Sequence, residues 1–478
     1  MDTLKSCIQL IRSYTGSDIY IVGGTLRDHL MGRESNDIDL VVEKDAVSIA
    51  KRFAQENGGS FILLDKDHGT ARVVFKDKQL TVDIMESKGK DIYDDLAKRD
   101  FTMNALACKI SLNGTFDLDQ IIDPFGGIED IKKKQIRAIS NIGFQEDPIR
   151  MMRAVRFMAE FDFDLEDHTV CLIKENSDRL QEAAVERIAY ELFHLLKCSR
   201  THYYFNIMDK YLNLLNKVFP EIEPMKDVGQ CKYHVVDSWT HSLYTLNVVE
   251  SIIYADGYFE NHLKRAYEEH TRQILGGGHT RLQLIKLAAL FHDIGKPSAR
   301  WVDETGRVRF RGHEITGMEI MADISDRLKL SSKEKQFLCK MVKEHMWPLT
   351  LYKENDVSGS AVYGLFKNFG EDTLDILLIS LADIIATRKL LHPHEEMGMY
   401  KVHIEYLANN YLTRFKDIAD LSNILNGNDI KSRFSLKDDE QIGALLEAVR
   451  KGIFFGKIPP ERERALQYIM DEILKQPE

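Results

Sequence analysis

Cysteine pairs, membrane-length apolar runs and an excess of positive charge are all missing from this sequence. The six cysteines stand at positions 7, 108, 171, 198, 231 and 339 and form no Cys-x-x-Cys pair, which argues against a disulfide framework and a zinc knuckle. No apolar run approaches the length of a membrane span, and the N-terminus lacks the layout of a secretory signal. These absences predict a cytoplasmic protein with no membrane partner.

The charge balance is acidic overall. The chain carries 64 basic and 75 acidic residues and a net charge of −11. Taken alone, this argues mildly against nucleic-acid binding, because phosphate contacts need local positive charge. The average conceals a lysine run at 132–134, followed by Arg137, and arginines 150, 153 and 156 at helical spacing. A solvated helix face explains the lysine run as well as a phosphate contact does, so both interpretations stay open there.

The 478 residues are too many for one core and suggest roughly three to four domains. Strand-like runs occur only in the first part of the chain, to about residue 138. They are residues 18–22, 37–42, 60–64, 71–75 and 79–84. From residue 147 onward apolar residues recur three and four apart, which indicates amphipathic helices, and the polar stretch 255–281 indicates a loop-rich insertion. The sequence therefore predicts an α/β head followed by a long helical remainder.

Residues 20–42 carry the most specific pattern in the chain. A β-branched run leads to Gly23 and Gly24, a helix start follows, and a second apolar strand begins with Asp37 and Asp39. Carboxylates two apart on a strand project from one face. Glycines let the backbone approach phosphates, and a helix N-terminus attracts their charge. The pattern predicts a site for a nucleoside triphosphate chelated by a divalent metal.

Two further strand residues and one polar run belong to the same head. Arg72 and Asp83 each lie on a predicted strand, and Asp83 is either a third acidic group at the metal site or a strand-end acid that faces water. The run Arg99-Asp100-Phe101-Thr102-x-Asn104 mixes charge with helix-starting residues, which makes pure core packing a poor explanation.

Asp147 and Arg150 form a pair that can read a nucleotide base. Pro148 fits the first position of a helix, so the alternative role of Asp147 is an N-cap. Arg150 lies three residues further along and is close enough to act beside Asp147. A carboxylate accepts from the exocyclic amine of cytosine or adenine while a guanidinium donates to the ring acceptors. The pair thus predicts selection of C and A without a nucleic-acid template.

The helical part carries an independent set of histidines and aspartates. Its members are His241, His292, Asp293 and Asp383, with His313 and His345 as further candidates. Imidazoles and carboxylates on successive helices are common ligands of transition metals. A single histidine on an apolar face is usually a satisfied core residue, but an adjacent His-Asp before Gly-Lys is far more specific. The set predicts a divalent transition-metal site.

These motifs resemble those of the class II tRNA nucleotidyltransferases and bacterial poly(A) polymerases. The matching residues are Gly23-Gly24-x-x-Arg27-Asp28, Asp37-x-Asp39, Arg99-Asp100-Phe101-Thr102-x-Asn104-Ala105 and Glu146-Asp147-x-x-Arg150. Residues 234–390 resemble HD-type metal-dependent phosphohydrolases. The C-terminal stretch resembles the RNA-binding tail of the family around residues 426–429, 442–443 and 456–458.

The resemblance implies an elongated multidomain protein. Its α/β head is of the polymerase-β-like nucleotidyltransferase type, and an all-α neck, body, HD domain and tail follow. We expect the head at residues 1–138, the base-reading and RNA-binding neck and body at 139–232, the HD domain at 233–400 and the tail, which binds tRNA, at 401–478. A helical dimerisation element remains the alternative for the tail.

The reaction that the resemblance implies is addition of CMP, AMP or both to the tRNA 3′ end, with release of pyrophosphate. Asp37 and Asp39 would be the catalytic ligands of two Mg²⁺ ions about 3.5–4 Å apart. The nucleotide-binding residues would be Gly23, Gly24, Arg27, Arg99, Asp100, Asn104, Asp147, Arg150 and Arg153.

The chain departs from the family in the stretch Met85–Asp94, which follows the strand of Asp83. Members that add the terminal A tend to carry a longer flexible loop there, and an arginine often found near its start is replaced by Glu86-Ser87-Lys88. We therefore predict a CC-adding enzyme that uses CTP and works beside a separate A-adding enzyme. The alternatives are a CCA-adding or A-adding enzyme that also uses ATP, a poly(A) polymerase, and an HD phosphohydrolase whose head only binds RNA or nucleotide.

Overall fold

The computed structural model describes residues 11–473 except 35, 67–68, 77–78, 112, 230–235, 390–393, 420, 422–423 and 437. Cys7, Cys231 and the predicted domain boundary at 232–233 lie outside the described residues. The chain divides into two compact units, one made of Met1–Leu195 with Ile207–Val218 and the other of Leu196–Asn206 with Phe219–Glu478. Each unit is described by itself, and the finer division into four segments stays a prediction.

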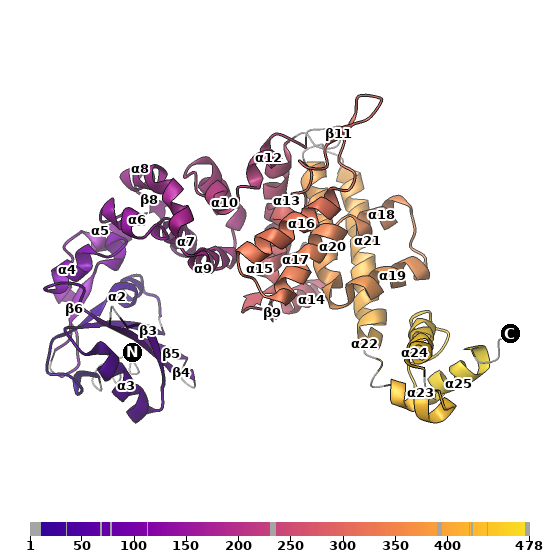
Figure 1. Cartoon of the computed structure of the whole chain (residues 1–478), viewed down its shortest axis with the longest axis horizontal. Helices are drawn as coiled ribbons and strands as arrows, with labels where there is room; N and C mark the ends of the chain where they lie inside the picture. Colours follow the sequence, from indigo (N-terminus) through magenta and orange to yellow (C-terminus); the bar gives the residue numbers. More distant parts are fainter. Residues whose placement is uncertain are drawn as a thin grey trace. The chain divides into compact units, whose positions relative to one another are not determined.

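The first unit begins with a six-stranded mixed sheet (Figure 1). Its strands, in sheet order, are β3 (Ser60–Asp65), β4 (Thr70–Phe75), β5 (Leu80–Glu86), β2 (Asp37–Val42), β1 (Ile19–Val22) and β6 (Ala107–Lys109). Neighbouring strands are antiparallel except for the parallel pair of β2 and β5. All five predicted strands are present, and the α/β head is confirmed.

One face of this sheet packs on a helix and the other carries polar side chains. In β4, Ala71 and Val73 are fully buried while Arg72 between them is half-buried, as expected for side chains that alternate between faces. The helix α3 (Ala46–Asn57) covers the apolar face, and its Phe53 meets Phe75 edge to face at 5.4 Å. The opposite face is left for the acidic residues of the site.

Helices make up most of the remaining part of the first unit. The first ones are α2 (Gly23–Leu30), α4 (Ile92–Ala97), α5 (Gly127–Lys132), α6 (Ile142–Glu146), α7 (Arg150–Phe161), α8 (Asp167–Asn176) and α9 (Val185–Leu196). The helix α10 (Thr201–Lys210) spans the boundary of the two units, and α11 (Leu215–Val218) follows. The short strands β7 (Gln135–Ile136) and β8 (Asp164–Leu165) pair in parallel. The lysines 132–134 are exposed at the end of α5, which fits a solvated face.

The second unit is helical, as predicted, apart from two short hairpins (Figure 1). Its first helices are α12 (Ile222–Lys226), α13 (Ser238–Tyr254), α14 (Asn261–Thr271), α15 (Arg281–Phe291), α16 (His313–Arg327), α17 (Ser332–Glu344) and α18 (Trp347–Lys353). The next are α19 (Gly359–Phe369), α20 (Thr373–Lys389), α21 (His394–Asn410), α22 (Lys416–Ala419), α23 (Gly427–Phe434), α24 (Asp439–Phe454) and α25 (Arg462–Tyr468). The hairpins are β9 (Ile274–Gly276) with β10 (His279–Thr280), and β11 (Trp301–Val302) with β12 (Val308–Arg309).

The prediction of a loop-rich insertion at 255–281 is wrong, because α14 occupies much of it. The segment is polar overall, but Leu263, Tyr267 and His270 recur at helical spacing and are buried. A narrow apolar stripe is enough to dock a helix on a large neighbour. None of the helices in the described part of the chain is both long and apolar enough to cross a membrane.

Candidate functional sites

The acidic residues of the head lie in one row across three neighbouring strands. The register pairs Asp39 with Asp83 across the parallel strands β2 and β5, and Asp83 with Arg72 across β5 and β4. Arg72 donates two hydrogen bonds of 2.8 Å to the two carboxylate oxygens of Asp83. Asp83 therefore lies beside the predicted metal site, with both oxygens bound to an arginine. The exposed Asp37 stands two residues before Asp39 on the same face.

The carboxylate of Asp39 is held against the glycine turn. Burial and the neighbouring charge of Asp83 raise its pKa to about 6. A Cβ atom at Gly24 would lie 3.1 Å from Asp39 Oδ2, and one at Gly23 would lie 2.7 Å from a nitrogen of Arg99. Gly23 also has a φ of +59°, a conformation that favours glycine. The turn thus needs both glycines for close approach.

The oxygen chemistry of this cluster fits Mg²⁺. Carboxylate oxygens are its preferred protein ligands, and two of them project from one strand face here. The raised pKa of Asp39 reports like charges gathered in a partly dehydrated place, which a bound cation would relieve.

The predicted nucleotide-binding residues next to the glycines form one hydrogen-bonded network. Asn104 accepts from Arg27 at 2.8 Å and donates to Asp100 at 2.9 Å. Asp100 in turn accepts two hydrogen bonds from Arg153, at 2.9 and 2.8 Å. Arg99 lies beside them, with its guanidinium 3.4 Å from the Asn104 carbonyl oxygen. The short 3₁₀ turn Thr102–Asn104 thereby joins the glycine turn to helix α7.

The charges in this network stabilise one another. Burial alone would raise the pKa of Asp100, but Arg153 and Asn104 outweigh it and hold the pKa at about 2. Burial opposes the charge of Arg153 as well, yet Asp100 and Glu191 raise its pKa above the ordinary value. Asp100 is thus a fixed anion that holds Arg153 in place.

Asp147 and Arg150 lie close together, but Asp147 does not cap the helix that begins at Arg150. The helix α7 begins at Arg150 with Ile149 as its N-cap, and Asp147 is the C-cap of α6. The alternative in which Asp147 caps the helix N-terminus is therefore wrong, because Pro148 and Ile149 intervene before the first helical residue. The closest Arg150 nitrogen lies 3.8 Å from Asp147 Oδ2. Arg187 donates to both oxygens of Asp147, at 2.8 and 2.9 Å.

The guanidinium of Arg150 is anchored on the backbone that carries the other predicted contacts. It donates to the carbonyl oxygens of Lys98 and Arg99, at 2.8 and 3.0 Å. The structure therefore gathers every predicted nucleotide-binding residue into one continuous region of the first unit. Arg187 and Asp95 were not predicted from the sequence. Arg187 reaches Asp147 by a tertiary contact. Asp95 lies in α4 and pairs with Arg99 just beyond the end of that helix, which no motif indicates.

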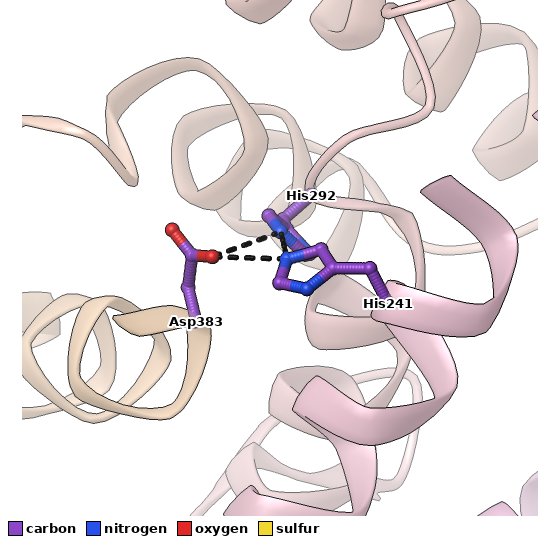
Figure 2. Close-up of side chains that lie close together, drawn as sticks. All are labelled: His241, His292 and Asp383. Atoms are coloured by element: carbon purple, nitrogen blue, oxygen red, sulfur yellow. Dashed lines mark hydrogen bonds and ion pairs between the residues drawn. The ribbon is translucent and has the colours of Figure 1, made fainter. Parts of the chain in front are cut away.

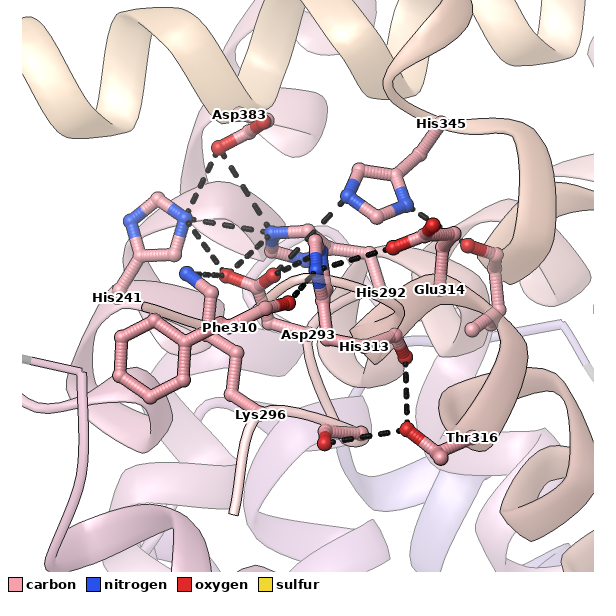
Figure 3. A network of polar contacts seen from close by, with 12 residues as sticks. His241, His292, Asp293, Lys296, Phe310, His313, Glu314, Thr316, His345 and Asp383 are labelled. Carbon is pink, nitrogen blue, oxygen red and sulfur yellow. Dashed lines mark hydrogen bonds and ion pairs between the residues drawn. The ribbon is translucent and has the colours of Figure 1, made fainter. Parts of the chain in front are cut away.

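The second cluster lies in the helical unit and brings together all six predicted ligands (Figure 3), of which Figure 2 draws His241, His292 and Asp383. They fall into two groups, each with ligand atoms within 4.8 Å of one another: His241, His292 and Asp383, and Asp293, His313 and His345. In the first group His241 Nε2 lies 3.0 Å from Asp383 Oδ1 and 3.3 Å from His292 Nε2.

Asp293 lies between the two groups. One oxygen is 3.2 Å from His292 Nε2, and the other is 3.4 Å from His313 Nε2 and 4.0 Å from His345 Nε2. Lys296 Nζ lies 2.5 Å from the first of these oxygens. The His-Asp-x-x-Lys spacing could have identified Lys296 in advance, since a helical turn brings the two side chains together.

Backbone carbonyls fix the orientation of three imidazoles. The Nδ1 atoms of His292, His313 and His345 lie 2.8, 2.9 and 2.7 Å from the carbonyl oxygens of Ala289, Phe310 and Val342. A carbonyl oxygen only accepts, so each Nδ1 carries the proton and each Nε2 of a neutral ring presents a lone pair. Within the described chain, the buried Nε2 atoms of His313 and His345 have no hydrogen-bond partner. This donor set fits divalent transition metals.

The electrostatics of the cluster favour a bound cation. Burial opposes the charge of His292, but Asp293 and Asp383 raise its pKa to about 10. Burial and the neighbouring rings of His292 and His313 lower the pKa of His345 to about 3. The carboxylates of Asp293 and Asp383 thus hold His292 as a cation in addition to the ammonium of Lys296, and a metal ion bound there would replace the proton of His292.

A cavity of about 1030 Å³ adjoins this cluster. Asp293, His313 and Asp383 contribute to its wall, so the candidate metal site is reachable by a small molecule.

Comparisons with known proteins identify three matched regions along the chain. Residues 19–137 match the poly A polymerase head domain, residues 162–226 match the family described as "Probable RNA and SrmB- binding site of polymerase A", and residues 239–388 match the HD domain. The head thus defines a polymerase-type nucleotidyltransferase, and the histidine cluster lies within the HD match.

Similar proteins extend the match over the rest of the chain. A CC-adding tRNA nucleotidyltransferase of Geobacter sulfurreducens is 40% identical over 40% of this chain and 44% of its own length. An A-adding tRNA nucleotidyltransferase of Deinococcus radiodurans is 27% identical over 93% of this chain and 94% of its own. The solved structure of the Thermotoga maritima CCA-adding enzyme with tRNA has a TM-score of 0.61 at 22% identity, over 98% of this chain and 94% of that one, which supports the fold. The chain thus carries matches to a poly A polymerase head domain, to the probable RNA-binding region of polymerase A and to an HD domain, and it is similar over nearly its whole length to tRNA nucleotidyltransferases.

Proposed function

We propose that this chain is a template-independent tRNA nucleotidyltransferase that adds CMP, as two consecutive C residues, to the tRNA 3′ end. The observation that carries the proposal is the row of Asp39 and Asp83 beside the Gly23–Gly24 turn. A triphosphate can approach the backbone there, next to carboxylates that hold divalent ions.

The residues of the head would act by positioning and by charge. Asp37 and Asp39 would hold two Mg²⁺ ions, which supply activation of the 3′-hydroxyl and neutralise the leaving pyrophosphate. The 3′ oxygen of the tRNA bonds to the α-phosphorus, the bond between that phosphorus and the bridging oxygen breaks, and the hydroxyl proton passes to solvent. Arg27, Arg99 and Arg153 would hold the triphosphate in line for this displacement.

Asp147 and Arg150 would select the base. The Asp147 carboxylate accepts two hydrogen bonds from Arg187 and keeps further lone pairs for the exocyclic amine of cytosine. Two carbonyl oxygens hold Arg150 beside the proposed triphosphate contacts, and from there its guanidinium would meet the base of a bound nucleotide. Guanine and uracil would present a carbonyl to the carboxylate and be rejected.

The short segment after β5 supports C rather than A as the nucleotide added. Strand β5 runs to Glu86 and α4 begins at Ile92, so only residues 87–91 lie between them. The backbone of this segment is fastened, with Ser87 N donating to the Val42 carbonyl at 3.0 Å and Lys88 N donating to Asp95 at 3.1 Å. We propose that the chain works beside a separate A-adding enzyme.

The test is incorporation on tRNA that lacks its 3′ CCA, with all four nucleoside triphosphates present and the products sequenced. The expected ends are CC. Ends in CCA would refute the CC-only proposal while keeping the nucleotidyltransferase, A addition only to tRNA ending in CC would make the chain an A-adding enzyme, and long A tails on any RNA would make it a poly(A) polymerase.

We propose a second function, phosphate-ester hydrolysis, at the HD cluster. It rests on six buried or half-buried ligands with three imidazoles oriented by carbonyl oxygens. The site would hold divalent transition metal, which supplies Lewis-acid activation of water and ester. Water adds its oxygen to phosphorus, the ester P–O bond breaks, and the leaving oxygen takes a proton. Changing His292 and Asp293 to alanine should remove hydrolysis of p-nitrophenyl phosphate and spare CMP addition, and equal hydrolysis by this variant and the parent would refute the assignment.

A further inference from the structure

Three arginines alternate along the segment that leads into the HD cluster. Arg307, Arg309 and Arg311 are exposed, while Val308 and Phe310 between them are half-buried. Side chains two apart in an extended segment share a face. Strand β12 and the residues after it therefore present a basic face, which ends two residues before the candidate ligand His313.

This segment is tied directly to the metal cluster. The Phe310 carbonyl oxygen lies 2.9 Å from His313 Nδ1, and Lys296 Nζ lies 5.8 Å from the centre of the Phe310 ring (Figure 3). The cavity of about 1030 Å³ is lined by all of residues 307–312 as well as by Asp293 and Asp383. A molecule in the cavity can thus touch the cluster and the arginines at once.

Three cationic side chains that line this cavity form no ion pair with a carboxylate in the described part of the chain. Asp303 accepts from Arg309 at 2.9 Å, but Arg307, Arg311 and Lys353 form no ion pair within the part of the chain that the structure describes. Besides Asp293 and Asp383, three glutamates line the cavity: Glu314, 3.2 Å from His313, Glu344, 3.3 Å from Lys343, and Glu396. The three cations therefore form a positive wall that suits an anion.

This wall exceeds what one phosphate group requires. The reacting phosphate would already be neutralised at the metal cluster and Lys296, so three additional cations call for additional negative charge. Trp347 and Tyr352 line the same cavity, and aromatic side chains of this kind stack on nucleotide bases. The volume suits a small molecule rather than a folded polymer.

We propose that the HD cavity binds a nucleotide unit with two phosphate groups, one at the metal cluster and the second on Arg307, Arg311 and Lys353. The unit is either a free nucleoside bisphosphate or the 3′-phosphorylated end of an RNA strand, which present the same chemistry. This inference rests on the proposed hydrolase function for the reaction but makes a separate prediction for binding.

The kinetic test compares the full-length protein with the double variant Arg307→Ala plus Arg311→Ala. The matched control is Arg300→Ala, an exposed arginine outside the cavity lining. With adenosine 3′,5′-bisphosphate the double variant should raise KM about tenfold at unchanged kcat, because charge-assisted hydrogen bonds to one phosphate are lost. With adenosine 3′-monophosphate its KM should change less than twofold. Equal changes for both substrates, or none for either, would overturn the proposal.

A binding measurement separates this inference from the hydrolase. Calorimetric titration of the metal-stripped chains with adenosine 3′,5′-bisphosphate should give a Kd about tenfold higher for the double variant than for Arg300→Ala. If no substrate is hydrolysed but this difference in Kd appears, the proposed hydrolase function is refuted and the proposed second phosphate site is supported. If hydrolysis occurs without this difference in Kd, the proposed second phosphate site is refuted and the hydrolase function is supported. Faster hydrolysis of a 3′-phosphorylated oligoribonucleotide than of the free bisphosphate would identify RNA ends as the source.

Discussion

The two candidate metal sites differ in the exposure and in the chemistry of their ligands. In the head, carboxylates project from one face of the interior strand β2, with Asp37 exposed and Asp39 partly exposed. In the HD cluster the side chains of His241, His292 and Asp293 are 1%, 1% and 3% exposed. An open oxygen site keeps room for a hydrated hard ion and a polymer end, whereas a buried imidazole cage selects a softer ion and a small ester.

The largest expected effect tests whether the open site is catalytic. Asp39→Asn keeps the shape of the side chain and removes its charge, so CMP incorporation should fall at least about a thousandfold, roughly 4 kcal/mol in transition-state stabilisation. Incorporation is measured by primer-extension gels on tRNA lacking CCA. His292→Ala is the control and should incorporate normally, and a loss in that control would contradict the independence of the two sites.

We expect the HD cluster to bind two ions, and the head to bind Mg²⁺ more weakly. The variant His313→Ala plus His345→Ala removes two imidazoles of the second group, and affinity for one of two Mn²⁺ or Ni²⁺ ions should fall at least about a hundredfold. This affinity is measured by equilibrium dialysis, with the metal content of the protein determined by mass spectrometry. His262→Ala, an exposed histidine paired with Asn409, should keep both ions. One ion in the parent protein would show that Asp293 does not serve two groups.

The buried anion of the head should contribute local stability. Asp100 has a pKa of about 2 against an ordinary 3.8, which corresponds to about 2 kcal/mol. Because the folded-state pKa is depressed, this stability is present above about pH 4 and is lost as the pH falls toward 2. Asp100→Asn should therefore speed amide exchange of Phe101 and Asn104 at pH 7 but alter it little near pH 2. An equal effect at both values would mean that the charge is unimportant.

The smallest expected effect concerns base selection. Arg187→Ala frees the oxygens of Asp147, and kcat/KM for CTP should fall about tenfold, since the carboxylate loses the partner that orients it. Steady-state kinetics with CTP and ATP measure this. Arg179→Ala, which removes a half-buried arginine of the same unit that pairs with Glu182, should behave as the parent. An unchanged kcat/KM in Arg187→Ala would leave Asp147 without the predicted role.

Much of this protein could be predicted because its motifs are local. Alternation of side chains along β2 places Asp37 and Asp39 on one face whatever surrounds the strand, and the turn at Gly23 depends on backbone sterics. The His292-Asp293 pair likewise predicted a metal site without tertiary information, and the structure gathers the six predicted ligands. The wrong predictions also had local causes. The helix α14 was predicted as a loop because its apolar stripe is narrow. Asp147 was considered as an N-cap, but Pro148 and Ile149 separate it from the first helical residue.

The sequence alone determined the chemistry available, namely paired carboxylates beside a glycine turn and a set of histidines with aspartates. Only the tertiary structure decided the partners. Asp83 stands beside Asp39 because β5 runs parallel to β2, and Arg187 reaches Asp147 from 40 residues away. Those contacts depend on packing between elements distant in the chain, and neither side-chain alternation nor helical spacing carries information about it.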